Sequence, residues 1–402
     1  YLQTQRFDTY SEALAKLDAN GSAYPCFCTA EQNEMRREAI QNDGLAAHPD
    51  PCRCMGCEER QQRMAAGEPY VWRLKVPQDR GMITVHDAVH GDVDFDAALQ
   101  DDMIIVRSDG SPTYNFAVVC DDVNMEMTHI IRGDDHFSNT PRQILVYEAL
   151  GYPTPVFAHI PMICGPDGKK LSKRHGAASV EEYRDLGYLA DSLFNYLALL
   201  GWAPDGETTV FSRDEMAERF SLDRLSKNPA SLDPEKLDWM NGQYIQSMGA
   251  QEFAQLLLPQ LQAAGYQPED AEQVAKMYPL VAERVKLVNQ AVPMLAYLFE
   301  DEVAFDEKSV AKILQKEGAG AKTNLEKVAA VLADCPWDCA GIEAAMRGVV
   351  DELGVKVKFV FQPVRVAVTG SQVSPPLCES MELLPREAVI ARIERAAQIA
   401  VD

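Results

Sequence analysis

The stretch Gly165-Pro166-Asp167-Gly168-Lys169-Lys170-Leu171-Ser172-Lys173-Arg174-His175-Gly176 sets four cationic side chains between glycines. An apolar segment precedes it, and a helix-capping pair, Ser179 and Glu182, follows it. Glycines allow such a loop to bend, and lysines supply compact charge for a phosphate that becomes more negative during a reaction. Because open α/β sheets bind ligands at the carboxyl ends of their strands, the pattern predicts a phosphate-binding loop of an α/β domain. A solvated basic turn is the alternative.

The segments before this loop alternate strand and helix. Short alternating strands are expected over Val71–Val76 and Ile83–Val85. Residues 113–165 then contain an element over 114–120, strands over 129–132 and 156–163, and a helix over 141–150. Strand–helix–strand order with apolar runs predicts half of a parallel, doubly wound sheet. From residue 179 onward the pattern is helical, and residues 249–402 form an all-helical block.

The composition bounds the possible functions. The 402 residues are 47% hydrophobic, enough for two to four packed domains. No segment approaches the roughly 18 to 20 apolar residues that a membrane span needs, and no leader-like segment is seen, so we expect a soluble, cytoplasmic protein. The net charge of −23 argues against nonspecific binding of nucleic acid over the whole surface. It leaves room for a specific RNA partner bound by local basic patches.

Five of the ten cysteines cluster near the N-terminus. Cys26-x-Cys28 and Cys52-x-Cys54 form two similar pairs, and in an extended chain residues i and i+2 point to the same side. Each pair can therefore direct two thiolates at one ion. Four thiolates complete a tetrahedral shell, so the pattern predicts a structural Zn²⁺ held by Cys26, Cys28, Cys52 and Cys54, with Cys57 as a substitute ligand. Reduced, free cysteines are the alternative.

The basic loop belongs to a wider set of motifs. Lys170-Leu171-Ser172-Lys173-Arg174 resembles the KMSKS loop of class I aminoacyl-tRNA synthetases. Further blocks are similar to the glutamyl branch of that class and keep its order: residues 108–116, 131–136, 139–143, 193–197, 200–202 and 233–242. On these motifs the chain is identified as a member of the bacterial glutamyl-tRNA synthetases.

The resemblance implies an α/β plus all-α architecture with five parts. Residues 1–20 would be a remnant of the first half of a partial Rossmann (parallel, doubly wound) catalytic domain, and residues 111–178 its second half with the KMSKS-like loop. Residues 21–110 would be an inserted domain that grips the tRNA acceptor end and carries the zinc site. Residues 179–248 would form a helical stem-contact domain and residues 249–402 a helical anticodon-binding domain.

The resemblance also implies the reaction, the ATP-dependent ligation of L-glutamate to tRNA(Glu) through glutamyl-adenylate, with ATP bound as its Mg²⁺ complex. The implied catalytic residues of the basic loop are Lys170, Ser172, Lys173 and Arg174. The implied ATP-binding residues are Lys173, Asp135, His136, Met162 and Ile163. Tyr114 and Arg132 would line the glutamate pocket, and a guanidinium does offer a planar fork to a carboxylate.

Each of these roles has a structural alternative. Arg132 could form an ion pair with Asp134 or Asp135, Tyr114 could be a core residue with a tethered hydroxyl, and His136 could be purely structural.

The implied tRNA contacts in the C-terminal block are arginines and lysines. Arg284 and Arg365 would contact anticodon bases, because arginine reads base edges and stacks on exposed bases. Lys356 and Lys358 would meet phosphates. Ordinary surface ion pairs are the alternative for both arginines. We expect a monomer.

The HIGH sequence, the other signature of the class, does not occur in these residues. In the family it lies upstream of the region that matches Tyr1, so we expect the segment that carries it to be missing and the chain alone not to activate glutamate. Two other functions stay open: a noncatalytic tRNA-binding protein derived from the same family, and a non-discriminating enzyme that also charges tRNA(Gln).

Overall fold

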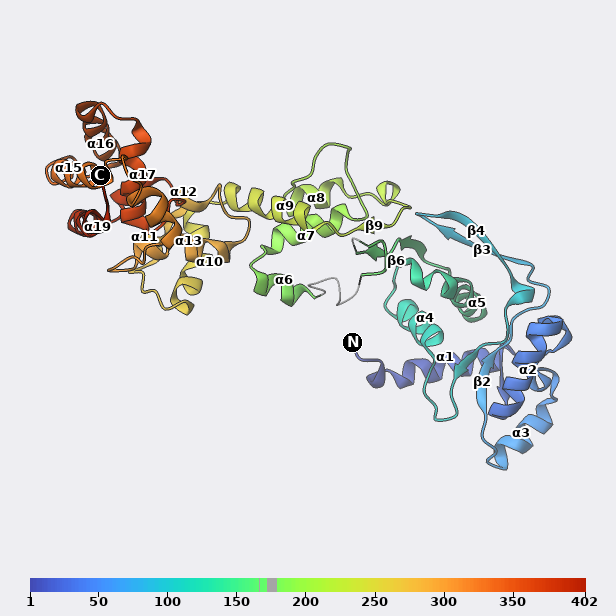
Figure 1. Ribbon diagram of the computed structural model, residues 1–402. Helices are drawn as coiled ribbons and strands as arrows, with labels where there is room; N and C mark the ends of the chain where they lie inside the picture. The colour runs from blue at the N-terminus through green and yellow to red at the C-terminus, as the bar shows by residue number, and fades with distance from the viewer. Residues whose placement is uncertain (166, 172–178) are drawn as a thin grey trace. The chain divides into compact units, whose positions relative to one another are not determined.

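The computed structural model describes residues 1–165, 167–171 and 179–402. These residues divide into two units (Figure 1). Unit 1 comprises residues 1–170, 198–208 and 214–232, and unit 2 comprises residues 171–197, 209–213 and 233–402. No helix in the described ranges combines the length and the hydrophobicity that crossing a bilayer requires.

A four-stranded sheet forms the centre of unit 1. Its strands lie in the order β4 (Gly91–Asp96), β3 (Met82–Asp87), β7 (Val156–Ile160) and β6 (His129–Gly133). β7 is parallel to both β3 and β6, whereas β3 and β4 form an antiparallel hairpin. The predicted parallel α/β sheet is therefore confirmed as the centre of a mixed sheet. The register places Arg132 opposite His159.

Helices α1 (Phe7–Ala19), α4 (Tyr114–Asn124) and α5 (Thr140–Leu150) pack together beside this sheet. Their shared core buries Leu17, Phe116, Val119, Ile144 and Val146. Tyr114–Cys120 is thus the first part of a helix. The strand expected over 156–163 is divided into β7 and β8 (Ile163–Cys164), because Pro161 between them has no backbone N–H for the ladder. β8 pairs in parallel with β9 (Ala230–Ser231).

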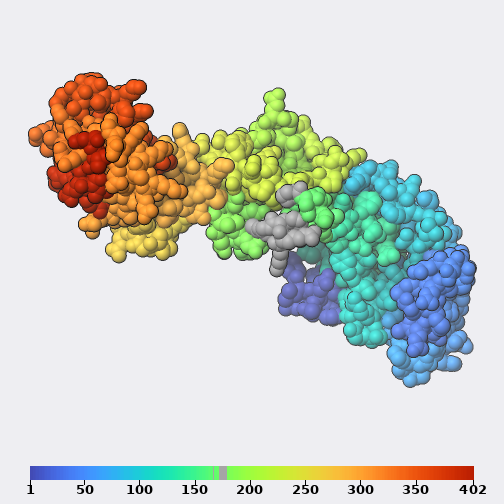
Figure 2. All heavy atoms as spheres, in the orientation of Figure 1, coloured from blue at the N-terminus to red at the C-terminus, as the bar shows by residue number. Residues whose placement is uncertain are grey.

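A smaller sheet in unit 1 carries the cysteine segment. Strands β1 (Ala23–Cys26), β2 (Val71–Leu74) and β5 (Ile104–Val106) are antiparallel, and helices α2 (Ala30–Asp43) and α3 (Cys57–Ala65) lie between β1 and β2 in the sequence. α2 begins with a reciprocal capping box between Thr29 and Gln32. The space-filling view shows this segment in blue on the surface of unit 1 (Figure 2). α8 (Arg213–Arg219) also lies largely in this unit.

Unit 2 is helical throughout its described residues from 249 onward, as predicted. Its core buries the apolar faces of four long helices, with Val328, Met346, Val364 and Ile393 at its centre. The α-helices of this unit are α6 (Val180–Leu186), α7 (Ala190–Leu199), α9 (Pro234–Ser247), α10 (Ala250–Ala263), α11 (Ala271–Lys276), α12 (Tyr278–Val281), α13 (Ala291–Leu295), α14 (Glu307–Ser309), α15 (Ala321–Leu332), α16 (Cys339–Leu353), α17 (Val357–Thr369), α18 (Leu377–Glu382) and α19 (Arg386–Ile399). A π-helical turn, η10 (Val310–Leu314), follows α14.

Candidate active site and metal centre

Arg132 lies at the carboxyl end of β6, with its guanidinium held by uncharged groups. Its Nε donates to His159 Nε2 at 3.1 Å, and its Nη2 donates to Thr140 Oγ1 at 2.9 Å and to Gln143 Oε1 at 2.8 Å. Within the described residues, no ion pair joins Arg132 to a carboxylate, Asp134 and Asp135 included. Burial lowers the pKa of Arg132. The guanidinium is therefore oriented by neutral groups, and the nearby Asp122 carboxylate attracts it without an ion-pair contact.

His159 and Asp87 form the layer beneath Arg132, and both side chains are fully buried. His159 Nδ1 lies 2.6 Å from Asp87 Oδ2, and the His159 backbone N–H donates to the same oxygen at 3.1 Å. Burial lowers the pKa of His159, and Asp87 only partly offsets it. Although burial opposes ionisation of Asp87, the backbone N–H of His90 and the His159 ring lower the pKa of that carboxyl. His159 is therefore neutral and Asp87 is charged.

The structure brings three other predicted glutamate and ATP residues, Tyr114, Asp135 and His136, to this end of the sheet. Tyr114 is half-exposed at the start of α4, and its ring centroid lies 5.7 Å from that of His136. His136 and Asp135 belong to the 3-10 turn Asp134–Asn139 that follows β6. Lys170 Nζ lies 3.2 Å from Asp135 Oδ2, and this contact lowers the pKa of Asp135.

The remaining predicted ATP and catalytic residues lie on the chain beyond β7. Met162 and Ile163 are half-buried around the start of β8. Ser172, Lys173 and Arg174 lie outside the described residues. Lys170 is therefore the predicted member of the basic loop whose contacts can be described.

Three of the four predicted zinc ligands come together with an aspartate. Ligand atoms of Cys26, Cys28, Asp50 and Cys52 all lie within 4.8 Å of one another. The sulfurs of Cys28 and Cys52 are 3.8 Å apart, close to the separation of about 3.8 Å that two Zn–S bonds of about 2.3 Å make at a tetrahedral angle. Burial raises the pKa of the Cys26 and Cys28 thiols. A bound divalent cation would reverse that shift, so three sulfurs and one carboxylate oxygen fit Zn²⁺.

Cys54, the fourth ligand expected from the sequence, is exposed and not in this group. Asp50 occupies that place because its carboxylate is fixed from several sides. Its Oδ1 accepts from the Cys52 backbone N–H at 2.8 Å, and its Oδ2 lies 3.1 Å from Arg73 Nε. Asp50 and Arg73 are both buried. Cys57 is exposed at the start of α3 and is not in the group either.

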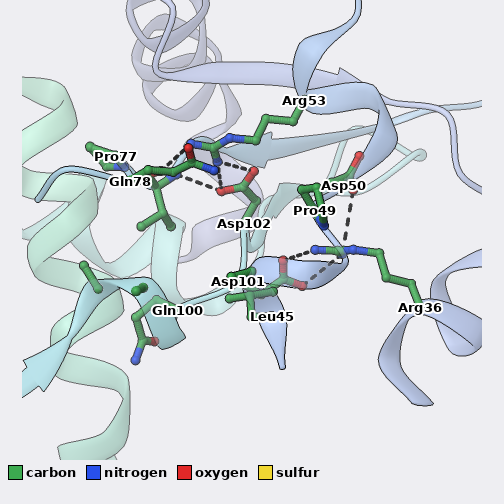
Figure 3. A pocket seen from close by; sticks show the side chains of 14 residues that line it. Arg36, Leu45, Pro49, Asp50, Arg53, Pro77, Gln78, Gln100, Asp101 and Asp102 are labelled. Atoms are coloured by element: carbon green, nitrogen blue, oxygen red, sulfur yellow. Dashed lines mark hydrogen bonds and ion pairs between the residues drawn. The ribbon is translucent and has the colours of Figure 1, made fainter. Parts of the chain in front are cut away.

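A cavity of about 360 Å³ lies next to Asp50 (Figure 3). Two arginines in its wall point at carboxylates. Arg36 Nη2 lies 2.5 Å from Asp101 Oδ1 and its Nη1 lies 3.9 Å from Asp50 Oδ2, whereas Arg53 Nη1 lies 2.5 Å from Asp102 Oδ2. Both cations are neutralised, so this cavity offers no free positive charge to an anion. Its ion pairs instead hold the segment that carries Asp50.

The two arginines predicted to read the anticodon lie near each other in unit 2. Arg365, on α17, donates through Nη1 to Ser374 Oγ at 2.5 Å and to the Pro375 carbonyl at 2.7 Å. Burial, and then the charge of the neighbouring Arg284, lower the pKa of Arg365. Neither arginine takes part in an ion pair within the described part of the chain.

Two family models match the chain. One, described as the catalytic domain of class I tRNA synthetases (E and Q), matches residues 1–239, and the other, an anticodon-binding domain, matches residues 252–397. Glutamate–tRNA ligase 1 of Caldanaerobacter subterraneus subsp. tengcongensis is 44% identical over 98% of this chain and 82% of its own length. The chain belongs to the glutamate–tRNA ligase family of class I aminoacyl-tRNA synthetases.

Other members of the glutamate–tRNA ligase family agree in sequence and in structure. The glutamate–tRNA ligase of Moorella thermoacetica is 43% identical over 99% of this chain and 82% of its own length. The crystal structure of a glutamate tRNA ligase from Elizabethkingia meningosepticum in complex with its amino acid superposes with a TM-score of 0.88, at 27% identity, over 99% of this chain and 84% of that one. The predicted class I fold with a helical anticodon domain is confirmed.

The sequence did not single out three residues that shape these sites: His159, Asp87 and Asp50. His159 stands in an apolar strand, where a lone polar residue is a signal of a buried hydrogen-bond network. Asp50 stands two residues before Cys52, the same spacing as within each cysteine pair, and this was the available signal for a carboxylate ligand. Asp87 had no local signal, because its partner lies 72 residues away in the sequence.

Proposed function

We propose that the chain serves the ATP-dependent ligation of L-glutamate to tRNA(Glu) through glutamyl-adenylate. The observation that carries this proposal is the Arg132 guanidinium, oriented by three neutral acceptors and paired with no carboxylate in the described residues. A half-buried cation with no carboxylate in ion-pair contact favours an incoming anion, and a planar guanidinium favours a carboxylate in particular. Tyr114 would line the same pocket beside it.

The proposed roles around ATP follow from charge and position. Asp135, His136, Met162 and Ile163 would hold ATP, bound with Mg²⁺, while Lys170, Ser172, Lys173 and Arg174 would stabilise the pyrophosphate as it leaves. The contact of Lys170 with Asp135 supports this arrangement, because it places a loop cation beside a proposed ATP residue. Positioning and charge stabilisation would supply the catalysis, with no covalent enzyme intermediate.

The proposed tRNA contacts follow the domain division expected from the sequence. Residues 21–110 would grip the acceptor end, residues 179–248 the stem, and Arg284 and Arg365 in residues 249–402 the anticodon bases. A structural Zn²⁺ would stabilise the acceptor-end lobe through Cys26, Cys28 and Cys52, with Asp50 or Cys54 as fourth ligand. Asp50 is favoured because its carboxylate already lies with the three sulfurs. The enzyme would act as a monomer, in the cytoplasm, where its substrates are.

We further propose that these 402 residues alone bind tRNA but do not activate glutamate, since they contain no HIGH sequence. Detectable glutamate-dependent exchange of pyrophosphate into ATP by this polypeptide with tRNA would contradict this. A noncatalytic tRNA-binding role would then be excluded as well. Equal affinity for tRNA(Glu) and tRNA(Gln) would instead favour a non-discriminating enzyme.

Binding of a non-hydrolysable glutamyl-adenylate analogue to this chain, measured by calorimetry, tests the glutamate pocket. Arg132→Gln should weaken the analogue at least about tenfold, because a charged pair contributes about 1.5 to 3 kcal/mol. Arg37→Gln removes an exposed guanidinium of α2 and should leave the affinity unchanged. Equal affinities for the wild type and Arg132→Gln would overturn the assignment of Arg132.

A further inference from the structure

Three exposed lysines surround a cavity of about 360 Å³ in unit 2. Lys312 lies on the π-helical turn η10, Lys316 lies shortly after it, and Lys358 lies in the first turn of α17. No aspartate or glutamate lines the cavity, and none of the three lysines takes part in an ion pair within the described residues. In a chain of net charge −23 this is a local concentration of uncompensated positive charge, which favours an anionic ligand.

The floor of the same cavity is apolar and partly aromatic. Ile313, Phe359 and Pro363 line it, and Lys358 Nζ lies 5.2 Å from the centroid of the Phe359 ring. A hydrated inorganic anion gains nothing from such a floor. An unpaired nucleotide does, because its base stacks on an aromatic ring while its phosphate meets the cations.

The position of the cavity on α17 relates it to Arg365. Lys358 and Arg365 are seven residues apart in one helix, so they lie on nearly the same face and about 10 Å apart along the axis. Arg365 lies near Arg284, the other arginine proposed to contact anticodon bases. Lys358 and Arg365 therefore place the cavity and the arginine about two helical turns apart on α17, a length scale of one or two nucleotides.

We propose that this cavity binds a nucleotide that flanks the anticodon of the tRNA. Lys312, Lys316 and Lys358 would hold its phosphate, and Phe359 would stack on its base. The inference rests on the proposed function, because it takes tRNA as the partner of the anticodon-binding domain. The cavity would be a second contact site in that domain, separate from Arg284 and Arg365. Its phosphate contact would contribute affinity, whereas the two arginines would determine base preference.

The test measures binding of a tRNA(Glu) transcript to the full chain by fluorescence anisotropy between 50 and 200 mM salt. Each phosphate that a protein neutralises on a single strand contributes about 0.7 to the slope of log K against log salt. Because the lysines hold one phosphate, Lys312→Ala with Lys358→Ala should reduce the slope by about 0.7 and weaken binding about fivefold or more at the lower salt. The matched control, Lys276→Ala with Lys327→Ala, removes the same charge elsewhere in unit 2 and should retain the wild-type slope.

A second variant separates stacking from charge. Phe359→Leu keeps the floor apolar but removes the ring, so it should weaken binding about fivefold or more without changing the salt slope. Thermal unfolding of each variant checks that the helical core is intact. If Phe359→Leu is destabilised, the lysine variants, which alter exposed side chains only, decide whether the cavity binds tRNA.

The outcomes also separate this inference from the proposed function. A wild type that binds tRNA(Glu) and prefers its anticodon, together with cavity variants equal to the control, would overturn the cavity site alone. A wild type that binds no tRNA would overturn both. Loss of slope in the cavity variant, with anticodon preference retained, is the expected result.

Discussion

His159 has both ring nitrogens engaged, Nδ1 at 2.6 Å from Asp87 Oδ2 and Nε2 at 3.1 Å from Arg132 Nε. Because the Arg132 N–H donates, Nε2 must accept, and the single ring proton must lie on Nδ1. A second proton on Nε2 would set two donors against each other. The orientation of Arg132 therefore requires a neutral histidine, and Asp87 fixes the tautomer that supplies it.

This requirement predicts a pH dependence of stability. Burial lowers the pKa of His159 below its value of about 6.5 in the unfolded chain, so the unfolded state takes up the proton first. Stability should fall as the pH drops from 7.5 to 5.5, whereas Asp87, whose pKa is also lowered, stays charged in that window. In urea unfolding, the free energy of unfolding should fall less between pH 7.5 and pH 5.5 for His159→Asn than for the wild type. The control His129→Asn removes an exposed histidine, and its free energy of unfolding should fall with pH as much as that of the wild type.

At the metal centre, the structure predicts which fourth ligand matters. Asp50→Asn replaces a carboxylate by a neutral amide, a poor Zn²⁺ ligand, while the hydrogen bond from the Cys52 backbone N–H is retained. Zinc content, measured on the purified chain by atomic emission, should fall well below one per chain in this variant. Cys54→Ser changes an exposed thiol and should keep its zinc. The reverse pattern would return Cys54 to the ligand set.

Among the secondary-structure elements, α17 ends at a glycine that leaves no room for a side chain. Gly370 caps this helix with φ +78°, and a Cβ there would collide with the backbone oxygen of Ala304. Gly370→Ala should cost more than about 2 kcal/mol, since left-handed backbone alone costs about 1 to 2 kcal/mol in a non-glycine residue. Gly354→Ala, at the similar cap of α16 with open space around it, should cost only the backbone part. Thermal unfolding would show the difference as a larger fall in Tm for Gly370→Ala.

The elements that the sequence predicted well are those defined by local signals. The capping pair Ser179 and Glu182 and the helix expected over 141–150, which is α5, both follow from residues a few positions apart. The pairing of β3 with β7 is not local, because it joins segments 70 residues apart, and periodicity carries no information about sheet partners. For the same reason, the contact between Asp87 and His159 could not be predicted from the sequence.

The candidate sites divide in the same way. The motifs led directly to Arg132, Tyr114 and the cysteine pairs, since each carries its chemistry in its residue type. Which donor completes the metal group depends on the 3-10 turn Pro51–Cys54, which directs Cys52 inward and leaves Cys54 exposed. In an extended chain Cys52 and Cys54 would point to the same side, so both would be metal ligands. The 3-10 turn, which the sequence did not predict, therefore decides the fourth ligand.

On the scale of the whole molecule, charge sets how an acidic protein can bind an acidic RNA. A net charge of −23 opposes RNA over most of the surface, so binding must come from places where cations lack a carboxylate partner. Within the described residues, Arg284, Arg365 and the three cavity lysines are such cations. Nonspecific RNA should therefore compete weakly, and the affinity should depend on a few contacts.

We expect the preference for the tRNA(Glu) anticodon to be lost when either Arg284 or Arg365 is removed. Arg365→Gln should reduce the ratio of affinities for tRNA(Glu) and for a transcript with one anticodon base replaced, because one base contact contributes about 1 to 3 kcal/mol, or about five- to a hundredfold. Arg365 is held by Ser374 and Pro375, so the glutamine variant loses a preset orientation as well as a charge. Lys327→Ala, which removes a cation already paired with Glu352, should retain the wild-type ratio. If both variants discriminate like the wild type, base reading does not depend on Arg365, and the anticodon would have to be recognised by another face of unit 2.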